Sequence, residues 1–360
     1  MKTRKSDHWL LISLTALVII VLITSTHGNA AQVTAPTNPE SKVYKFRIQS
    51  IASASDPAYF KNMGDFCERV KALSNGQIEL TLFPLGGIVP LLEMFDAIRL
   101  GSLDIGLTYG GWWSGKVGAA VEVESGLPYG IQNPIEGYTL FYDKDQVSKP
   151  WVSILREVYG KAGIQYIGPV FGGAATIVSR RPLAKLSDFK GAKISESGAE
   201  AKFFEMLGAK TMVLPAGELY TGLAMGVVDG AGWAGPGKMF GTYKLMEVAK
   251  YVQWPPTGCT VLNLIMNMDK WNSLPDNLKR VLVDSSRIFY LDYSVEGYNN
   301  DIKWMRIAKS QYGVQETGLP MAERWQKGKE LRAIYAAKNP YAKEMIEIEL
   351  SYLKLLGYID

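Results

Sequence analysis

The sequence predicts an α/β protein with two similar lobes that face each other across a cleft. The first observation is a repeat: residues 93–104 and 218–229 share an acid, an aromatic residue, a glycine and a terminal aspartate in register. The second is that an amphipathic helix and an apolar strand ending in proline precede each copy. Helix–glycine–strand alternation builds parallel sheets flanked by helices, and two distant copies imply two lobes.

Each copy predicts a helix that stops at a glycine and continues as a strand. Apolar residues recur at helical spacing in both copies (Met94, Phe95 and Ile98; Leu219, Tyr220 and Leu223). Gly101 and Gly226 stand where a left-handed helix end is needed, which glycine adopts at little cost. A short strand and an aromatic, glycine-rich stretch follow each glycine (108–113 and 233–238). Because ligands bind beyond the carboxyl ends of such strands, we expect the two stretches to face each other.

The first 31 residues have the features of a signal peptide. A short basic region precedes an apolar run at 9–23, and small residues at Gly28 and Ala30 fit a cleavage site. The run is short for a membrane span, which is the alternative interpretation. We therefore expect export to the periplasm and a linker at 32–42.

Residue types in the mature chain exclude several kinds of site. Both histidines, His8 and His27, lie in the predicted signal peptide. Their removal excludes serine–histidine and cysteine–histidine nucleophiles and histidine-bound metals. The 360 residues carry a formal net charge of +4 without a run of basic residues, so no nucleic-acid partner is expected. Cys67 is interpreted as a buried thiol, with a disulfide to Cys259 as the alternative.

Four motifs give the chain a family resemblance: residues 186–194 (LSDFKGAKI), 214–220 (LPAGELY), 226–230 (GVVDG) and 268–275 (MDKWNSLP). Together they resemble the extracytoplasmic substrate-binding subunits of tripartite ATP-independent periplasmic (TRAP) transporters, of the dicarboxylate-binding type. Residues 229–236 are most similar to the branch that binds 2-oxo and 2-hydroxy acids. The resemblance implies a two-lobed periplasmic binding protein fold, hinge closure on a small solute, delivery to a membrane permease, and a homodimer through the C-terminal helix.

Three positions depart from that family pattern. Ser195 stands where the family has an arginine that pairs with the solute's carboxylate. Gly232 stands where the 2-oxo acid branch has a glutamate, and Val170 or Phe171 replaces a glutamine. Losing the arginine alone would leave the charge of an anionic ligand poorly compensated in a closed cleft. Losing the arginine and the glutamate together removes both charges and suits a ligand that carries less charge. We therefore expect a solute less charged than the family norm, held by aromatic stacking and apolar burial.

Six residues are expected to contact the solute: Tyr109 and Trp112 from the first lobe, Phe171, Ser195 and Trp233 from the second, and Trp254 as a lid or hinge residue. No catalytic residue, metal ligand or cofactor is expected. The sequence does not decide whether a cation binds together with the ligand. It also leaves open whether another side chain replaces the missing arginine (Lys116, Lys193, Lys238 or the Arg180–Arg181 pair).

The domain boundaries follow from the repeat and the resemblance. Lobe I is expected at 43–168 plus about 255–290, and lobe II at 169–254 plus about 291–320. A helical C-terminal region is expected at 321–360, with Pro320 and Pro340 as breaks.

Two other functions stay open from the sequence. The same fold could serve as the ligand-sensing input of a membrane sensor. A secreted glycoside hydrolase could instead use two carboxylates, with Glu122 and Glu124 or Glu196 and Glu200 as the pair. We interpret these four as surface acids, so the sequence predicts a binding protein and not an enzyme.

Overall fold

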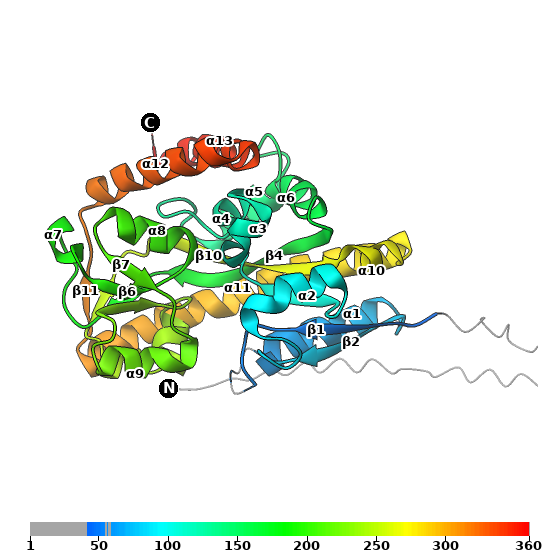
Figure 1. Cartoon of the computed structure of the whole chain (residues 1–360), viewed down its shortest axis with the longest axis horizontal. Helices are drawn as coiled ribbons and strands as arrows, with labels where there is room; N and C mark the ends of the chain where they lie inside the picture. Colours follow the sequence, from blue (N-terminus) through cyan, green and yellow to red (C-terminus); the bar gives the residue numbers. More distant parts are fainter. Residues whose placement is uncertain (1–41, 55, 57–58, 360) are drawn as a thin grey trace, which may run out of the picture. The chain divides into compact units, whose positions relative to one another are not determined.

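The computed structural model describes residues 42–54, 56 and 59–359 (Figure 1). The predicted signal peptide and nearly all of the predicted linker lie outside the described residues. Within the described ranges, no helix is long and apolar enough to cross a membrane.

Two sheets carry the fold. Sheet A has the order β2-β1-β3-β10-β4, with β10 antiparallel to both neighbours, and sheet B has the order β11-β9-β5-β8-β6-β7. The strands of sheet A are β1 (Tyr44–Gln49), β2 (Ile78–Phe83), β3 (Ile105–Thr108), β4 (Ile164–Ala175) and β10 (Gly258–Asn267). Those of sheet B are β5 (Ile177–Ser179), β6 (Lys193–Ser195), β7 (Lys210–Met212), β8 (Gly230–Gly232), β9 (Tyr251–Gln253) and β11 (Gln315–Thr317).

Helices surround the sheets and connect their strands. The α-helices are α1 (Gly64–Leu73), α2 (Met94–Leu100), α3 (Ser114–Val117), α4 (Ala120–Glu124), α5 (Pro134–Tyr142), α6 (Trp151–Gly160), α7 (Leu186–Phe189), α8 (Gly198–Met206), α9 (Leu219–Ala224), α10 (Met268–Asn272), α11 (Asp276–Tyr312), α12 (Met321–Lys338) and α13 (Pro340–Leu355). Short 3₁₀ or π turns are η1 (Tyr59–Met63), η2 (Leu91–Glu93), η3 (Gly110–Trp113), η4 (Ala216–Glu218), η5 (Gly237–Thr242) and η6 (Leu245–Glu247).

The repeat forms the same unit in both sheets, as predicted. In sheet A the chain runs β1-α1-β2-α2-β3, and in sheet B it runs β6-α8-β7-α9-β8. The resulting strand orders, β2-β1-β3 and β7-β6-β8, are equivalent and parallel in both sheets. The two copies therefore lie in separate sheets, which confirms the predicted α/β architecture.

The aspartate that ends each copy anchors the first strand of its sheet. Asp104 Oδ2 accepts the backbone N–H of Arg47 in β1 at 2.7 Å. Asp229 Oδ2 accepts the backbone N–H of Lys193 in β6 at 2.9 Å. The repeated aspartates thus join the first and third strands of both units.

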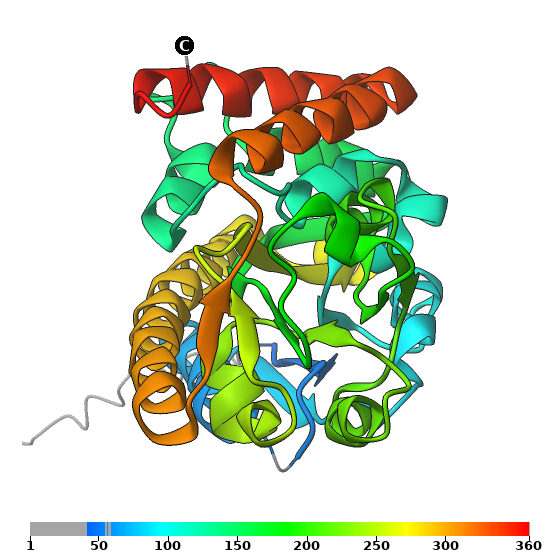
Figure 2. The same ribbon diagram turned by 90° about the vertical axis from the view of Figure 1, so that its left-hand side faces the viewer.

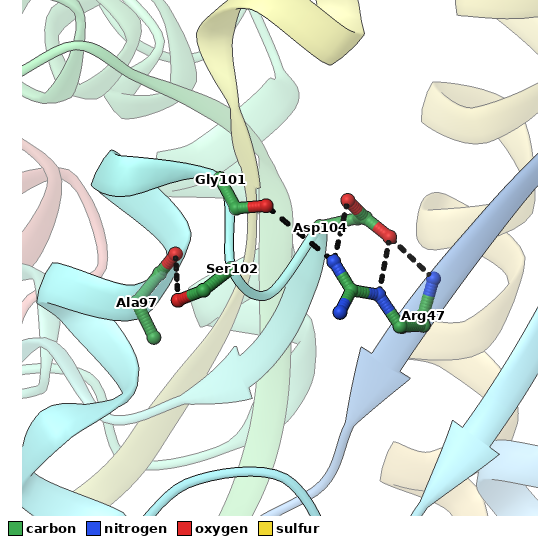
Figure 3. Close-up of polar contacts among 5 residues, drawn as sticks. All are labelled: Arg47, Ala97, Gly101, Ser102 and Asp104. Atoms are coloured by element: carbon green, nitrogen blue, oxygen red, sulfur yellow. Dashed lines mark hydrogen bonds and ion pairs between the residues drawn. The ribbon is translucent and has the colours of Figure 1, made fainter.

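The two glycines end their helices in the left-handed region, with φ of +80° at Gly101 and +73° at Gly226. Figure 3 shows the Arg47 guanidinium donating to the Gly101 carbonyl oxygen as well as to the Asp104 carboxylate. Lys193 Nζ donates to the Gly226 carbonyl oxygen at 2.9 Å. The equivalence therefore extends to side-chain contacts made by different cations.

The boundaries between the sheets differ in detail from the predicted lobe boundaries. β4 stays in sheet A as far as Ala175, beyond residue 168, and β5 begins sheet B at Ile177. α11 is one unbroken helix through residue 290, and it packs on β4 of sheet A and on η5, which follows β8 of sheet B. One continuous helix therefore packs against elements of both sheets.

The C-terminal helices form a layer of their own. α12 begins directly after Pro320 and α13 begins at Pro340, as predicted. The two lie side by side in Figures 1 and 2; α12 contacts α8, and α13 contacts α4, α5 and α6. Both cysteines are buried free thiols, which confirms the interpretation of Cys67.

A buried ion pair holds this layer in place. Arg332 Nε of α12 lies 3.0 Å from Glu349 Oε2 of α13, and their side chains are 3% and 1% exposed. Arg332 Nη1 also donates to the Pro128 carbonyl oxygen at 2.8 Å. The pair therefore ties both helices to the segment after α4.

We predict that Arg332→Met lowers the free energy of unfolding by about 3–5 kcal/mol, because Glu349 is left buried and unpaired. Urea unfolding measures the loss. The double variant with Glu349→Leu should regain most of it. Lys343→Met serves as the control, because its pair with Glu347 is more than 60% exposed and contributes about 0–1 kcal/mol. Equal losses in the single and double variants would contradict this.

Candidate functional site

A cleft lies where the equivalent strands of the two sheets end. It encloses about 1190 Å³, including space open to solvent. Sheet A contributes residues 50–52 after β1 and Tyr109 after β3. Sheet B contributes Ser195 at the end of β6 and Trp233 after β8. Because the strand order reverses at β1 and at β6, this is the place where open α/β sheets bind ligands.

Four of the six predicted contact residues line this cleft: Tyr109, Trp112, Ser195 and Trp233. The Tyr109 and Trp112 rings meet edge to face, with centroids 5.3 Å apart. The Ser195 hydroxyl oxygen accepts the Leu214 backbone N–H at 3.2 Å, so it also holds the chain that leaves β7. The structure therefore brings the aromatic stretches of both repeat units together, as expected.

The other two predicted residues lie elsewhere. Phe171 is 1% exposed and packs against Gly297 of α11, because alternating side chains on β4 turn it away while Gly172 lines the cleft. Trp254 lines a separate surface hollow with Ile302 and Met305 of α11. Neither lines this cleft, but Phe171 lines an adjoining pocket that shares Asp56, Gly172 and Lys238 with it.

The interpretation of the four glutamates as surface acids is wrong. Glu122, Glu124 and Glu200 are 8%, 0% and 9% exposed, and Glu196 and Glu200 line the cleft. Glu124 lies in the core, where Asn263 and Tyr159 donate to it at 2.8 Å each. Sequence analysis missed these side chains because burial depends on the packing of α4 and α8, which no local pattern records.

Glu196 occupies the space that the missing side chain of position 232 would need. A Cβ at Gly232 would overlap Glu196 Oε2, while Glu196 Oε1 accepts the Ser197 backbone N–H at 3.0 Å. The carboxylate of Glu196 therefore lies beside position 232, where the family resemblance implies a glutamate. The cleft therefore contains carboxylates although position 232 is a glycine.

Burial changes the protonation of both cleft glutamates. Desolvation, and then repulsion from Glu200, raises the pKa of Glu196 to about 8. Desolvation raises the pKa of Glu200 to about 7, opposed by a hydrogen bond with Thr257, whose Oγ1 lies 2.7 Å from Glu200 Oε1. Burial therefore favours the protonated form of both glutamates.

The candidate substitutes for the missing arginine are mostly engaged elsewhere. Lys116 pairs with Asp96, and Lys193 donates to Gly226, and neither lines the cleft. Lys238 does line it, but its Nζ lies 2.5 and 2.7 Å from the two carboxylate oxygens of Asp56. In the described part of the chain, no group of three or more histidine, cysteine, aspartate or glutamate residues is arranged to hold a metal ion.

We predict that Gly232→Ala lowers the free energy of unfolding by about 1–3 kcal/mol, since the added methyl group displaces Glu196. The loss should shrink in a Glu196→Ala background, as a double-mutant cycle in urea would measure. Gly217→Ala is the control, because a Cβ there meets no atom within 4 Å. Additive effects of Gly232→Ala and Glu196→Ala would refute the contact.

Comparisons with known proteins found similar sequences and structures. The family model of bacterial extracellular solute-binding proteins, family 7, matches residues 48–311. The monocarboxylate 2-oxoacid-binding periplasmic protein of Nostoc sp. is 27% identical over 61% of this chain, a match that spans 61% of that relative's length.

Solved structures share the fold. A TRAP periplasmic solute binding protein from Colwellia psychrerythraea, with bound calcium and pyruvate, has a TM-score of 0.78 at 23% identity and covers 88% of this chain and 96% of its own. One from Chromohalobacter salexigens, with bound (S)-(+)-2-amino-1-propanol, has a TM-score of 0.74 at 18% identity and covers 86% and 95%. The family model spans more than half of the sequence, so the chain belongs to bacterial extracellular solute-binding protein family 7, as the motifs predicted.

Proposed function

We propose that the chain is exported to the periplasm, captures a small organic solute in the cleft, and delivers it to a TRAP-type membrane permease. The observation that carries this is a single cleft lined by equivalent strand ends of both sheets. A solute there contacts both lobes at once, so binding favours their closed arrangement. The closed form is then the one that a permease recognises.

The chemistry of the cleft favours a solute less anionic than those of many relatives. Ser195 gives no cation at the position of the usual arginine, and Lys238 is already paired with Asp56. Tyr109, Trp112 and Trp233 supply aromatic surface instead. Stacking and apolar burial at about 25 cal/mol per Å² then provide the affinity.

Hydrolysis by Glu196 and Glu200 is less well supported than binding. Carboxylate-pair hydrolases keep one carboxylate ionised beside a protonated acid. In this cleft, burial raises the pKa of both glutamates. Glu122 and Glu124 offer no better pair, because Glu124 is enclosed in the core.

We predict that Trp233→Ala weakens solute binding about tenfold to a hundredfold, because a ring in the cleft is lost. Native mass spectrometry identifies the solute that purifies with the protein, and calorimetry with that solute measures affinity. Trp254→Ala is the matched control and should leave affinity unchanged, since Trp254 lies outside the cleft. Loss of binding in Trp254→Ala but not in Trp233→Ala would contradict the proposal.

We also predict that pyruvate and lactate, with or without calcium or sodium, leave the melting temperature unchanged. The reason is that the cleft offers an acid no unpaired cation. Thermal-shift measurements against neutral and aromatic solutes check this. A strong shift with either acid, dependent on the metal ion, would show that the carboxylate site of the relatives is retained.

A further inference from the structure

We infer that the cleft recognises a protonated amine on the solute, with Glu196 and Glu200 as its counter-charges; this inference rests on the proposed function. The first step is the balance of charge. Four charged side chains line the cleft among the described residues: Asp56, Glu196, Glu200 and Lys238. Lys238 and Asp56 neutralise each other. Two carboxylates therefore remain without a cation.

The second step is that both carboxylates keep an oxygen free for a ligand. Glu196 uses Oε1 for the Ser197 N–H, and Glu200 uses Oε1 for Thr257. Among the described residues, no hydrogen bond or ion pair reaches the Oε2 atom of either. Because Gly232 has no side chain, Glu196 Oε2 fits beside it in the wall of the cleft.

A third carboxylate extends the negative region behind the wall of the cleft. Glu122 Oε2 is buried without a hydrogen-bond partner among the described residues, in a side chain that is 8% exposed. It lies against Gly198, as does the hydroxyl oxygen of Tyr109, which lines the cleft. Desolvation, and then repulsion from Glu122, Glu196 and Glu200, raises the pKa of that hydroxyl well above its usual value. An anionic solute would meet the same repulsion.

The aromatic rings suit the same ligand. Tyr109, Trp112 and Trp233 line the cleft with the carboxylates, and ring faces attract ammonium groups by about 0.5–2 kcal/mol. A cation on an apolar or aromatic body would pair with both carboxylates and contact the rings. A neutral solute would supply no counter-charge, so the pKa values of both glutamates would stay raised.

The free protein bears a cost that the amine would relieve. Glu196 and Glu200 have pKa values raised above the unfolded value, so the stability they contribute is full at low pH and is lost as pH rises towards about 8. Tyr109 faces both glutamates, while Tyr335 of α12 and Tyr129 face Glu200. The nearest positive charges lie one residue further away, with Lys338 facing Glu122 and Arg324 facing Tyr129. An ammonium group would lower both pKa values, so amine affinity should rise between about pH 6 and pH 8.

The test uses two matched series of probes on the full mature chain at about pH 8. The first series is 2-amino-1-propanol, 1,2-propanediol and lactate, and the second is 2-phenylethylamine, 2-phenylethanol and phenylacetate. We expect the amines to raise the melting temperature, and the alcohols and acids to leave it unchanged. Amine affinity should fall about tenfold or more in Glu196→Gln and Glu200→Gln.

The variants also separate recognition from structure. Glu196→Gln should raise the melting temperature of the free protein at about pH 8 while weakening amine binding, since it removes a desolvated charge. A merely structural glutamate would instead lower it. Glu205→Gln is the matched control, because Glu205 lies on α8, pairs with Lys202 and does not line the cleft.

Three results would overturn the inference: no shift with either amine, an equal shift with the matching alcohol, or undiminished amine binding in Glu196→Gln. A solute that binds in the cleft, by the loss in Trp233→Ala, but carries no cationic nitrogen would also overturn it while leaving the proposed function intact. The absence of any solute bound in the cleft would overturn the proposed function itself.

Discussion

The structure depends on one repeated constraint, the bond between an aspartate and the first strand of its sheet. Asp104 holds β1 and Asp229 holds β6, and both follow a glycine that ends a helix in the left-handed region. These contacts fix where β3 and β8 begin, and therefore where their carboxyl ends point. The cleft, with its aromatic residues and carboxylates, lies between those ends.

Local sequence patterns predict much of this arrangement. The glycines and the apolar spacing of the repeat predict helix ends and short strands, because backbone conformation there is set by neighbouring residues. Duplication of the pattern predicts two equivalent units, and ligand binding at strand ends predicts Tyr109 and Trp233. The family motifs at 214–220 and 268–275 led to the family that the comparisons show.

The errors share one physical cause, since they concern which way a side chain points after tertiary packing. Phe171 and Gly172 are neighbours in β4, yet only the glycine lines the cleft. The sequence indicates for Glu196 only a place in a surface pair, although its carboxylate fills the space above Gly232. The two positions are adjacent because β6 and β8 pair, which a count of residues along the chain does not reveal.

The cleft illustrates the cost that binding imposes on a fold. Buried carboxylates without cations destabilise the free protein, and apolar residues at the same positions would avoid that cost. Their presence in a solute-binding cleft is explained if the ligand supplies the missing positive charge.

The most direct measurement is a crystal structure with the co-purified solute bound. The account predicts density between Trp112 and Trp233 with its polar end at Glu196 and Glu200; density at the Trp254 hollow, or an empty cleft beside a bound solute elsewhere, would contradict it.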